Sequence, residues 1–276
     1  MSASPEAASP APEIVVVLVE PAGPLNVGSV ARLCANFAIA QLRLVAPRCN
    51  PLGEEARRMA VHGQAQLEQA ATFASLAAAI ADCRRVVATS GRLEREELPL
   101  EGPGSALSWL IEPEADPGVD INPGVSINPG GAINPGGAMA PVALVFGRED
   151  RGLSNDELLQ AGKILRLESS ADYASLNLSH AVAICLHELR RIPAAKEPPG
   201  GSDGAGVTSL RGVLESTLAD GQDLLLEVGF LHPHTAHARM AKLRGLLQRA
   251  QIREGEVALI RGMVRQLRWA TTRGTP

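Results

Sequence analysis

Aromatic residues are scarce in this chain of 276 residues, which has four Phe, two Trp and one Tyr, or 3% of its composition. The core must therefore be built from Ala, Val, Leu and Ile. The scarcity argues against nucleic-acid-binding modules that stack bases on aromatic platforms. The length is sufficient for a substantial core, in one large domain or in a medium-sized domain with an appendage.

Disulfides and targeting segments are not indicated either. The four cysteines are Cys34, Cys49, Cys83 and Cys185; they form no CxxC pair, and three lie in apolar contexts. We expect core thiols in a reducing compartment. The first 13 residues contain no Lys or Arg, which excludes a signal peptide, and no apolar run reaches membrane-spanning length. The sequence therefore predicts a cytoplasmic protein without a membrane segment.

Several common site motifs are missing. No GxGxxG follows the first predicted strand and no GxxxxGK[ST] occurs, so a dinucleotide or nucleoside-triphosphate site is disfavoured. The absence of GxSxG argues against Ser/His/Asp hydrolysis. Metal-ligand spacing is limited to His232, His234 and His237 in a Pro-containing loop, and we expect no metal there.

Charge is distributed unevenly along the chain. The net charge is −4, but the segment from His237 to the end has nine Arg or Lys against Glu254 and Glu256, a balance of +7. The other 236 residues therefore carry −11. An acidic body with a basic C-terminal segment indicates a polyanionic partner, the alternative being an ordinary solvated basic face.

The apolar pattern predicts an α/β fold with a mostly parallel sheet. Short runs rich in β-branched residues alternate with helical patterns, as in buried parallel strands joined by helices. Strands are expected at 13–20, 42–47, 84–91, 141–147 and 163–167. The Ser154 and Glu157 pair is typical of a capping box. Three helices are expected between 210 and 270.

Two Pro- and Gly-rich segments interrupt this pattern. Residues 112–140 contain three copies of Ile-Asn-Pro-Gly and are expected to form a low-complexity insertion, or else a small stacked-turn repeat. Deletion of 118–138 should leave the fold intact. The full predicted organisation is a disordered tail at 1–12, an α/β domain at 13–191, a linker at 192–209 and a basic helical extension at 210–276.

Glycine or small polar residues follow four of the predicted strands. They are Asn26, Gly28 and Arg32; Thr89, Ser90 and Gly91; Gly147, Arg148 and Glu149; and Ser175 to Asn177 at the start of an apolar helix. Ligands of α/β sheets bind beyond the carboxyl ends of the strands, so these residues are expected to share one pocket. Taken singly, Gly28 and Gly147 fit plain turn glycines better than a ligand site.

Three segments resemble a known family. "PLNVGSVARLCANF" (24–37), "VALVFGREDRGLSNDEL" (142–158) and "YASLNLSHAVAICLHEL" (173–189) are similar to the three ordered motifs of the SpoU/TrmH class of SPOUT RNA 2′-O-ribose methyltransferases. With "LIRGMVRQLRWA" (259–270), the similarity is closest to the TrmJ branch, which methylates a ribose in the tRNA anticodon loop. The resemblance covers 13–191 strongly and the C-terminal segment more loosely.

The resemblance implies a SPOUT α/β domain with a C-terminal trefoil knot, S-adenosyl-L-methionine (SAM) as cofactor, tRNA as partner and a homodimer without metal. The substrate it implies is a nucleotide like that at tRNA position 32. Ribosomal RNA or another tRNA position is the alternative substrate. A non-catalytic RNA-binding relative and a nucleotide-binding enzyme unrelated to RNA are the alternative functions.

The resemblance also assigns residues. Its cofactor contacts fall on Thr89, Ser90, Gly91, Gly147, Leu167, Ala174, Ser175 and Leu176. Its catalytic set falls on Arg32, Asn26, Glu149, Ser175 and Asn177. The family's arginine is often taken as the base, but a guanidinium rarely gives up its proton. We therefore expect Arg32 to bind the adjacent phosphate and to stabilise the developing alkoxide rather than to act as the base.

Each assigned residue has a plainer interpretation. Asn26 could cap the first helix, and Arg32 could form a surface salt bridge of little energetic value. Glu149 and Arg151 could pair locally, and Ser175 could be an ordinary helix-start hydroxyl. We prefer the functional interpretation for the set because all members fall where one pocket is expected.

Overall fold

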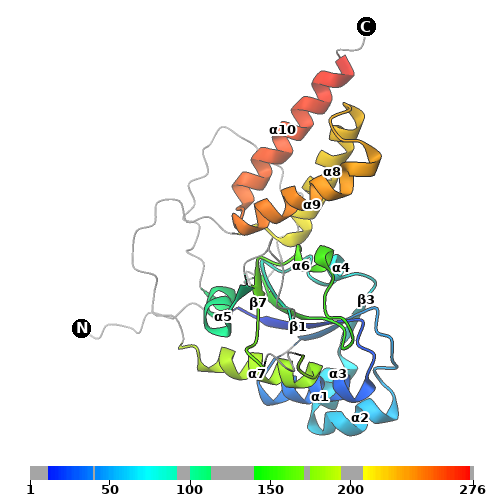
Figure 1. The fold of residues 1–276 in the computed structure, drawn as a ribbon, viewed down its shortest axis with the longest axis vertical. Helices are drawn as coiled ribbons and strands as arrows, with labels where there is room; N and C mark the ends of the chain where they lie inside the picture. Colours follow the sequence, from blue (N-terminus) through cyan, green and yellow to red (C-terminus); the bar gives the residue numbers. More distant parts are fainter. Residues whose placement is uncertain are drawn as a thin grey trace, which may run out of the picture.

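The computed structural model describes residues 12–39, 41–91, 100–112, 140–170, 175–193 and 208–273. Its centre is a seven-stranded sheet in the order β3-β2-β1-β6-β4-β7-β5, in which all strand pairs are parallel (Figure 1). The strands are β1 (Ile14–Val19), β2 (Gln41–Val45), β3 (Ala71–Phe73), β4 (Arg85–Thr89), β5 (Leu100–Glu101), β6 (Val142–Phe146) and β7 (Lys163–Leu165). The predicted α/β class and parallel sheet are confirmed.

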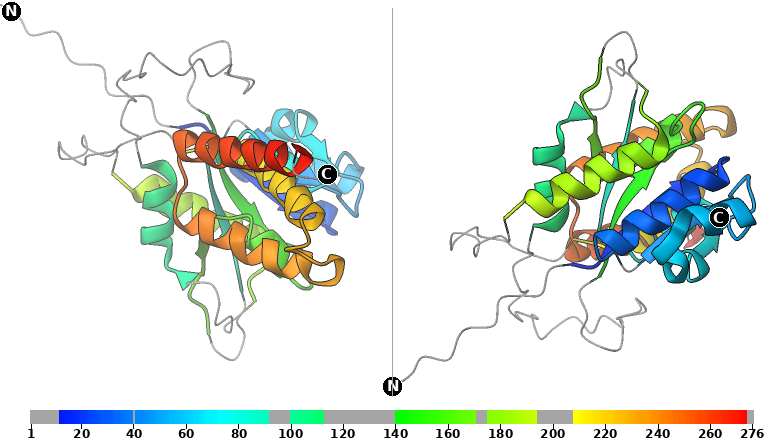
Figure 2. Two further views of the ribbon diagram at one scale, coloured as in Figure 1. Left: turned by 90° about the horizontal axis from the view of Figure 1, so that it is seen from above. Right: turned by 90° about the horizontal axis from the view of Figure 1, so that it is seen from below.

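Helices cover both faces of the sheet, so β1 is buried on both sides. Val16 and Leu18 pack into one core with α1 (Pro24–Asn36), α2 (Glu54–Ala60), α3 (Gln64–Glu68), α5 (Pro103–Ile111) and α7 (Leu178–Arg191). The alternate residues Val15, Val17 and Val19 pack into a second core with α4 (Leu76–Ala79) and α6 (Asn155–Leu158). The short 3-10 helix η1 (Val61–Gly63) joins α2 to α3. Figure 2 shows α1 and α7 side by side across the first face.

All five predicted strands are present, but two short edge strands, β3 and β5, were not predicted. They have three and two residues, too few to show a periodic pattern. The sequence of residues 73–83 has a helical pattern, but α4 within it has only four residues. The Ser75 hydroxyl caps it by accepting a hydrogen bond from the amide of Ala78 at 3.3 Å.

The three predicted C-terminal helices form a bundle, α8 (Arg211–Glu227), α9 (Pro233–Arg249) and α10 (Glu254–Arg273). Its own apolar core is made by Leu214, Leu218, Leu231, Ala236, Met240, Ile252 and Val257. The bundle lies above the α4 and α6 face of the sheet, and α10 projects away from it (Figure 1). Backbone hydrogen bonds fix the start of α8 to the loop before β4, from Arg211 to Cys83 at 3.2 Å and from Gly212 to Ala81 at 2.9 Å.

Three of the four cysteines are core thiols, as expected. Cys34, Cys83 and Cys185 are buried and unpaired, and burial raises the pKa of each thiol to about 12. Cys49 is only half-buried, and burial together with the nearby Glu149 raises its pKa. No helix in the described ranges is long and apolar enough to cross a membrane.

Some sequence-based predictions fall outside the described residues. They concern the tail at 1–11, most of the insertion (113–139), most of the linker (194–207), and Ala174. The domain boundaries and the trefoil knot stay predictions.

Candidate functional site at the carboxyl ends of the strands

Asn26, Glu149 and Asn177, three of the residues singled out from the sequence, lie together at one edge of the sheet. In the sheet order, β1 is bonded to β2 on one side and to β6 on the other, so the chain changes direction across the sheet at β1. Ligands of parallel sheets bind at such a switch point. The loops that follow β1, β6, β4 and β7 meet there because parallel strands end on the same side.

A hydrogen-bond network joins all three motifs at this edge. The carboxylate of Glu149 accepts bonds from the amides of Ala22 and Gly23 and from Nδ2 of Asn26, each at 3.1 Å. Asn26 Oδ1 in turn accepts a bond from Nδ2 of Asn177 at 3.1 Å. The structure therefore brings together three of the five predicted catalytic residues. In the sequence, Asn26 lies more than 120 positions from both Glu149 and Asn177.

Asn177 is also the residue that starts α7. Its Oδ1 accepts bonds from the Ser179 amide at 2.9 Å, the Ser179 hydroxyl at 2.8 Å and the His180 amide at 3.4 Å. These amides would have no partner within the helix. The helix-start role considered for Ser175 thus belongs to Asn177, while the Ser175 side chain is exposed.

Glu149 is ionised in this environment. Burial alone would raise the pKa of its carboxyl, but the hydrogen bonds from the Ala22 amide and the Asn26 side chain outweigh that effect and hold the pKa below its usual range. The carboxylate thereby fixes the β1–α1 turn and the orientation of Asn26. The capping role considered for Asn26 is wrong, because the N-cap of α1 is Gly23 and no side chain caps it.

Arg32 lies apart from the network. It is six residues beyond Asn26 on α1, about 9 Å along the helix axis. Its side chain is exposed and forms no hydrogen bond or ion pair with any residue in the described ranges, so the surface salt bridge considered for it is not formed there. Its backbone is closely packed: a Cβ added to Gly63 would lie 2.7 Å from the Cα of Arg32.

The predicted cofactor contacts after β4 connect three strands. The Thr89 hydroxyl donates to the carbonyl of Val145 at 3.1 Å, and the Ser90 amide donates to the carbonyl of Leu165 at 3.0 Å. No heavy atom of the described residues lies within 4 Å of the position a Cβ would take on Gly91. This loop is thus held at β6 and β7.

The other predicted cofactor contacts have different environments. Leu167 is half-buried and packs on the main core, whereas Leu176 is 39% exposed. Gly147 and Gly28 are not plain turn glycines. A Cβ on Gly147 would lie 2.3 Å from the carbonyl carbon of Gly152, and one on Gly28, inside α1, would lie 2.1 Å from the carbonyl oxygen of Ala56. Both positions require glycine for close backbone packing.

An ionic cluster around Arg148 was not predicted. Arg148 donates two bonds to Glu157, at 2.8 and 2.9 Å, and further bonds to Glu20 and to the Gly152 carbonyl. Hydrogen bonds to Glu157 and Glu20 raise the pKa of Arg148. The cluster fixes the loop after β6 to the end of β1. The predicted capping box is confirmed, and its Glu157 could have indicated where a neighbouring arginine would bind.

Arg151 does not pair with Glu149, contrary to the plainer interpretation of that loop. It contacts Glu20 at 3.4 Å and Asp150 at 4.0 Å. Beside it lies an open depression of about 500 Å³, lined by Arg148, Arg151, Gly152, Leu153, Ser154, Asn155 and Asp156. None of the predicted cofactor contacts that the structure describes lines this depression.

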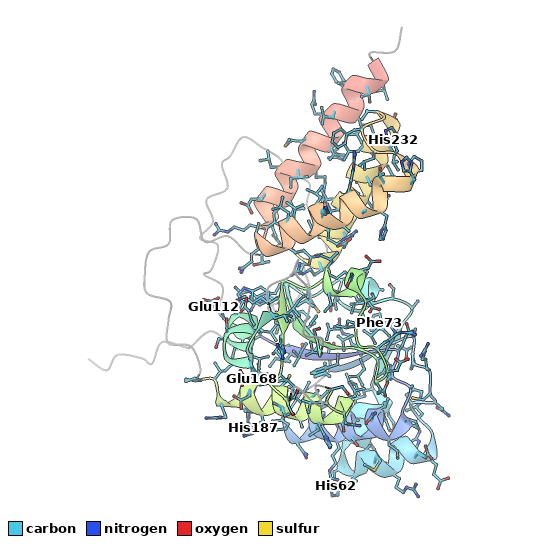
Figure 3. The ribbon with its side chains drawn as sticks, viewed as in Figure 1. His62, Phe73, Glu112, Glu168, His187 and His232 are labelled. Atoms are coloured by element: carbon cyan, nitrogen blue, oxygen red, sulfur yellow. The ribbon has the colours of Figure 1, made fainter. Side chains whose placement is uncertain are left out.

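The histidines are not arranged as a metal site. The rings of His232 and His234 stack with centroids 5.8 Å apart, and His237 faces Asp156. Within the described ranges, no group of three or more His, Cys, Asp or Glu side chains could hold a metal ion. Figure 3 shows His232 at the outer end of the bundle, far from His62 and His187 at the opposite face of the sheet.

Comparison with known proteins decides the family. Residues 13–187 match the model of the SpoU rRNA Methylase family. The chain belongs to this family. Residues 213–275 match a second model, that of the C-terminal domain of the tRNA methyltransferase TrmJ. The resemblance to the TrmJ branch is therefore confirmed for this SpoU methylase.

Similar full-length relatives support the same assignment. The tRNA (cytidine/uridine/adenosine-2′-O-)-methyltransferase TrmJ of Pseudomonas aeruginosa is 30% identical over 259 residues, which cover 91% of this SpoU methylase and 92% of the relative. The tRNA (cytidine/uridine-2′-O-)-methyltransferase TrmJ of Klebsiella pneumoniae is 32% identical over 255 residues, covering 91% and 94%. The crystal structure of TrmJ from Z. mobilis superposes with a TM-score of 0.73 at 26% identity, covering 92% and 98%.

Proposed function

We propose that this SpoU methylase transfers a methyl group from SAM to a ribose 2′-hydroxyl of tRNA, at a nucleotide in the anticodon loop like that at position 32. The TrmJ relatives, similar over nine-tenths of the chain, are tRNA 2′-O-methyltransferases. The observation that carries the proposal is the Glu149–Asn26–Asn177 network, which assembles the three family motifs at the strand ends.

The residues at the strand ends fit SAM. No described residue fills the space beside Gly91, which leaves the cofactor room near the backbone of the β4 loop. The half-buried Leu167 and the exposed Leu176 supply apolar walls for an adenine ring, with Thr89, Ser90, Gly147, Ala174 and Ser175 as the remaining contacts. When bound, SAM supplies a methyl group already activated by its sulfonium.

The chain's own residues then have to hold and activate the ribose. We assign Arg32 the binding of an adjacent phosphate and the stabilisation of charge developing on the 2′-oxygen. Its guanidinium is unpaired in the described structure, and a guanidinium rarely gives up a proton to act as a base. Glu149 orients the amide of Asn26, and Asn177 places the N-terminus of α7, with its partial positive charge, at the same edge. Ser175 contributes an exposed hydroxyl beside them.

The decisive experiment compares the wild-type chain with Arg32→Ala on transcribed tRNA, with 2′-O-methyl groups mapped by mass spectrometry and SAM binding followed by calorimetry. Loss of one such charge-stabilising group should slow methyl transfer about 100-fold or more and leave SAM affinity unchanged. Arg58→Ala is the matched control, because Arg58 is another exposed arginine, on the neighbouring helix α2. Retained turnover in Arg32→Ala would disprove the role of Arg32.

The same measurements, with tRNA binding followed at several salt concentrations, separate the alternative functions. Absence of SAM binding at millimolar concentration would favour a non-catalytic RNA-binding relative. Methyl groups mapped to ribosomal RNA or to another part of tRNA would replace the proposed substrate. Binding of tRNA that does not depend on salt would favour an enzyme unrelated to RNA, since phosphate contacts make RNA binding salt-dependent.

A homodimer in the cytoplasm completes the proposal. Exposed apolar side chains gather on α1, α2, η1 and α7, namely Leu25, Met59, Val61 and Ile184, and self-association would cover them. The buried unpaired thiols fit a reducing compartment. A monomeric mass in light scattering at micromolar concentration would contradict the homodimer.

A further inference from the structure

The α8–α9 turn exposes an aromatic ring. In the described ranges, the aromatic side chains of the α/β part are buried or half-buried, whereas Phe230 is 64% exposed and Trp269 is 51% exposed, both in the C-terminal bundle. The scarcity of aromatics in the sequence argued against stacking platforms. The structure nevertheless places two of these few rings on the surface of the part that carries the positive charge.

The backbone of this turn holds Phe230 outward. Gly229 adopts a φ of 75°, which ends α8, and the amide of Leu231 donates to the carbonyl of Leu225 at 2.9 Å. Leu231 is 2% exposed and fills the inner side of the turn. Arg239 donates to the carbonyl of Phe230 at 3.3 Å. The turn thus buries Leu231 and leaves the neighbouring Phe230 exposed.

The helix that follows is cationic. The α9 sequence contains no Asp or Glu, and its basic residues and histidines are His234, His237, Arg239, Lys242, Arg244 and Arg249. Arg244 is neutralised by Glu215, with N···O distances of 2.8 and 3.0 Å. Arg239 and Lys242 are exposed. A surface of this charge is complementary to a phosphate backbone.

This surface continues toward the strand-end site. His237 Nε2 lies 3.5 Å from Asp156 Oδ2, and α9 passes above α6 (Figure 1). Asp156 also lines the depression in the loop after β6, the loop that begins with Gly147 and Glu149. An RNA bound at the candidate site can therefore follow this loop onto α9 and reach the α8–α9 turn.

We infer that Phe230 stacks on an unpaired base of the RNA substrate while Arg239 and Lys242 contact the phosphates beside it. The inference rests on the proposed function for its choice of RNA. An exposed aromatic on a hydrogen-bonded turn next to cations has the parts that single-stranded RNA binding uses, because every base has a face to stack and every nucleotide carries a phosphate.

Phe230→Ala, Phe230→Trp and Val228→Ala in the full chain test the inference by tRNA binding over a range of salt concentrations. Phe230→Ala should weaken binding roughly 5- to 150-fold, the range for loss of one base–aromatic stack, with no change in salt dependence. Phe230→Trp should bind like wild type. Val228→Ala, which truncates a 47% exposed neighbour in the same turn, should bind like wild type as well.

Lys242→Gln tests the charge contribution separately. It should weaken binding to all RNA sequences alike and lower the slope of log affinity against log salt by about 1. Unchanged affinity in Phe230→Ala, or equal losses in Phe230→Ala and Val228→Ala, would overturn the inference. A change of oligomeric state in Phe230→Ala without loss of RNA affinity would instead make the turn a protein interface.

The outcome is distinguishable from failure of the proposed function. If the wild-type chain binds single-stranded RNA in a Phe230-dependent way but methylates no tRNA, the stacking site stands and the proposed activity falls. If it methylates tRNA and Phe230→Ala binds and turns over normally, the stacking site falls alone. A wild-type chain that binds no RNA would overturn both.

Discussion

Replacement of Asn177 separates two tasks that one amide performs. Its Oδ1 caps α7, and its Nδ2 ties α7 to Asn26 in the β1–α1 segment. Asn177→Ala removes both. Loss of an N-cap costs about 1 kcal/mol, and loss of an ordinary hydrogen bond costs about 1 kcal/mol more. We therefore expect the free energy of unfolding to fall by about 2 kcal/mol, as measured by urea denaturation followed by circular dichroism.

Asn177→Asp keeps the capping oxygen but loses the donor. A carboxylate at a helix N-terminus is favourable by about 0.3–1 kcal/mol, so the cap survives. The donor lost is the one that reaches Asn26, which already binds the ionised Glu149. Asn177→Asp should thus retain most of the stability that Asn177→Ala loses, while both lose the contact between motifs and with it methyl transfer.

Ser175→Ala is the control for stability, since its exposed hydroxyl caps nothing. Its free energy of unfolding should stay within about 0.5 kcal/mol of wild type. If Asn177→Asp is as unstable as Asn177→Ala, the cap does not stabilise α7. If Asn177→Ala unfolds at the wild-type urea concentration, neither bond contributes and the account of this helix start is wrong.

Much of the fold is predictable because its strongest signals are local. The β-branched runs of β1, β4 and β6 are continuous because helices cover both faces of the sheet. The capping box at Ser154 is complete within four residues. By contrast, β3 and β5 exist only through pairing with β2 and β7, and nothing in two or three residues indicates a partner so distant along the chain.

The site was predictable as a group of residues but not as a set of contacts. Asn26, Glu149 and Asn177 follow strands in the sequence, and they lie at one edge of the sheet because parallel strands end on the same side. Which side chains form hydrogen bonds with each other depends on side-chain torsion angles, and the spacing of residues in the sequence does not specify those angles. The pairing of Arg148 with Glu20 and Glu157 joins residues from three elements, so only the assembled fold distinguishes it from the local alternatives.

Two further predictions address packing and acid stability. Gly28→Ala should destabilise the fold by about 1–3 kcal/mol in urea denaturation, because its Cβ would lie 2.1 Å from the carbonyl oxygen of Ala56; wild-type stability would show that α1 and α2 can separate at little cost. The pKa values of Glu20 and Glu157 lie below 4.5. The pKa of Glu20 is lowered chiefly by its hydrogen bond to Arg148. The pKa of Glu157 is lowered because its bonds to Arg148 and the Ser154 amide outweigh the opposing effect of burial. Carboxyls with lowered pKa values stabilise the fold at higher pH, and this contribution is lost as the pH falls below about 4.5, because the unfolded chain then binds more protons. Urea denaturation from about pH 7 to about pH 3 should show this loss. Glu157→Gln should be less stable at neutral pH and lose less on acidification. An acid profile of Glu157→Gln parallel to that of wild type would mean that this carboxylate is not linked to folding.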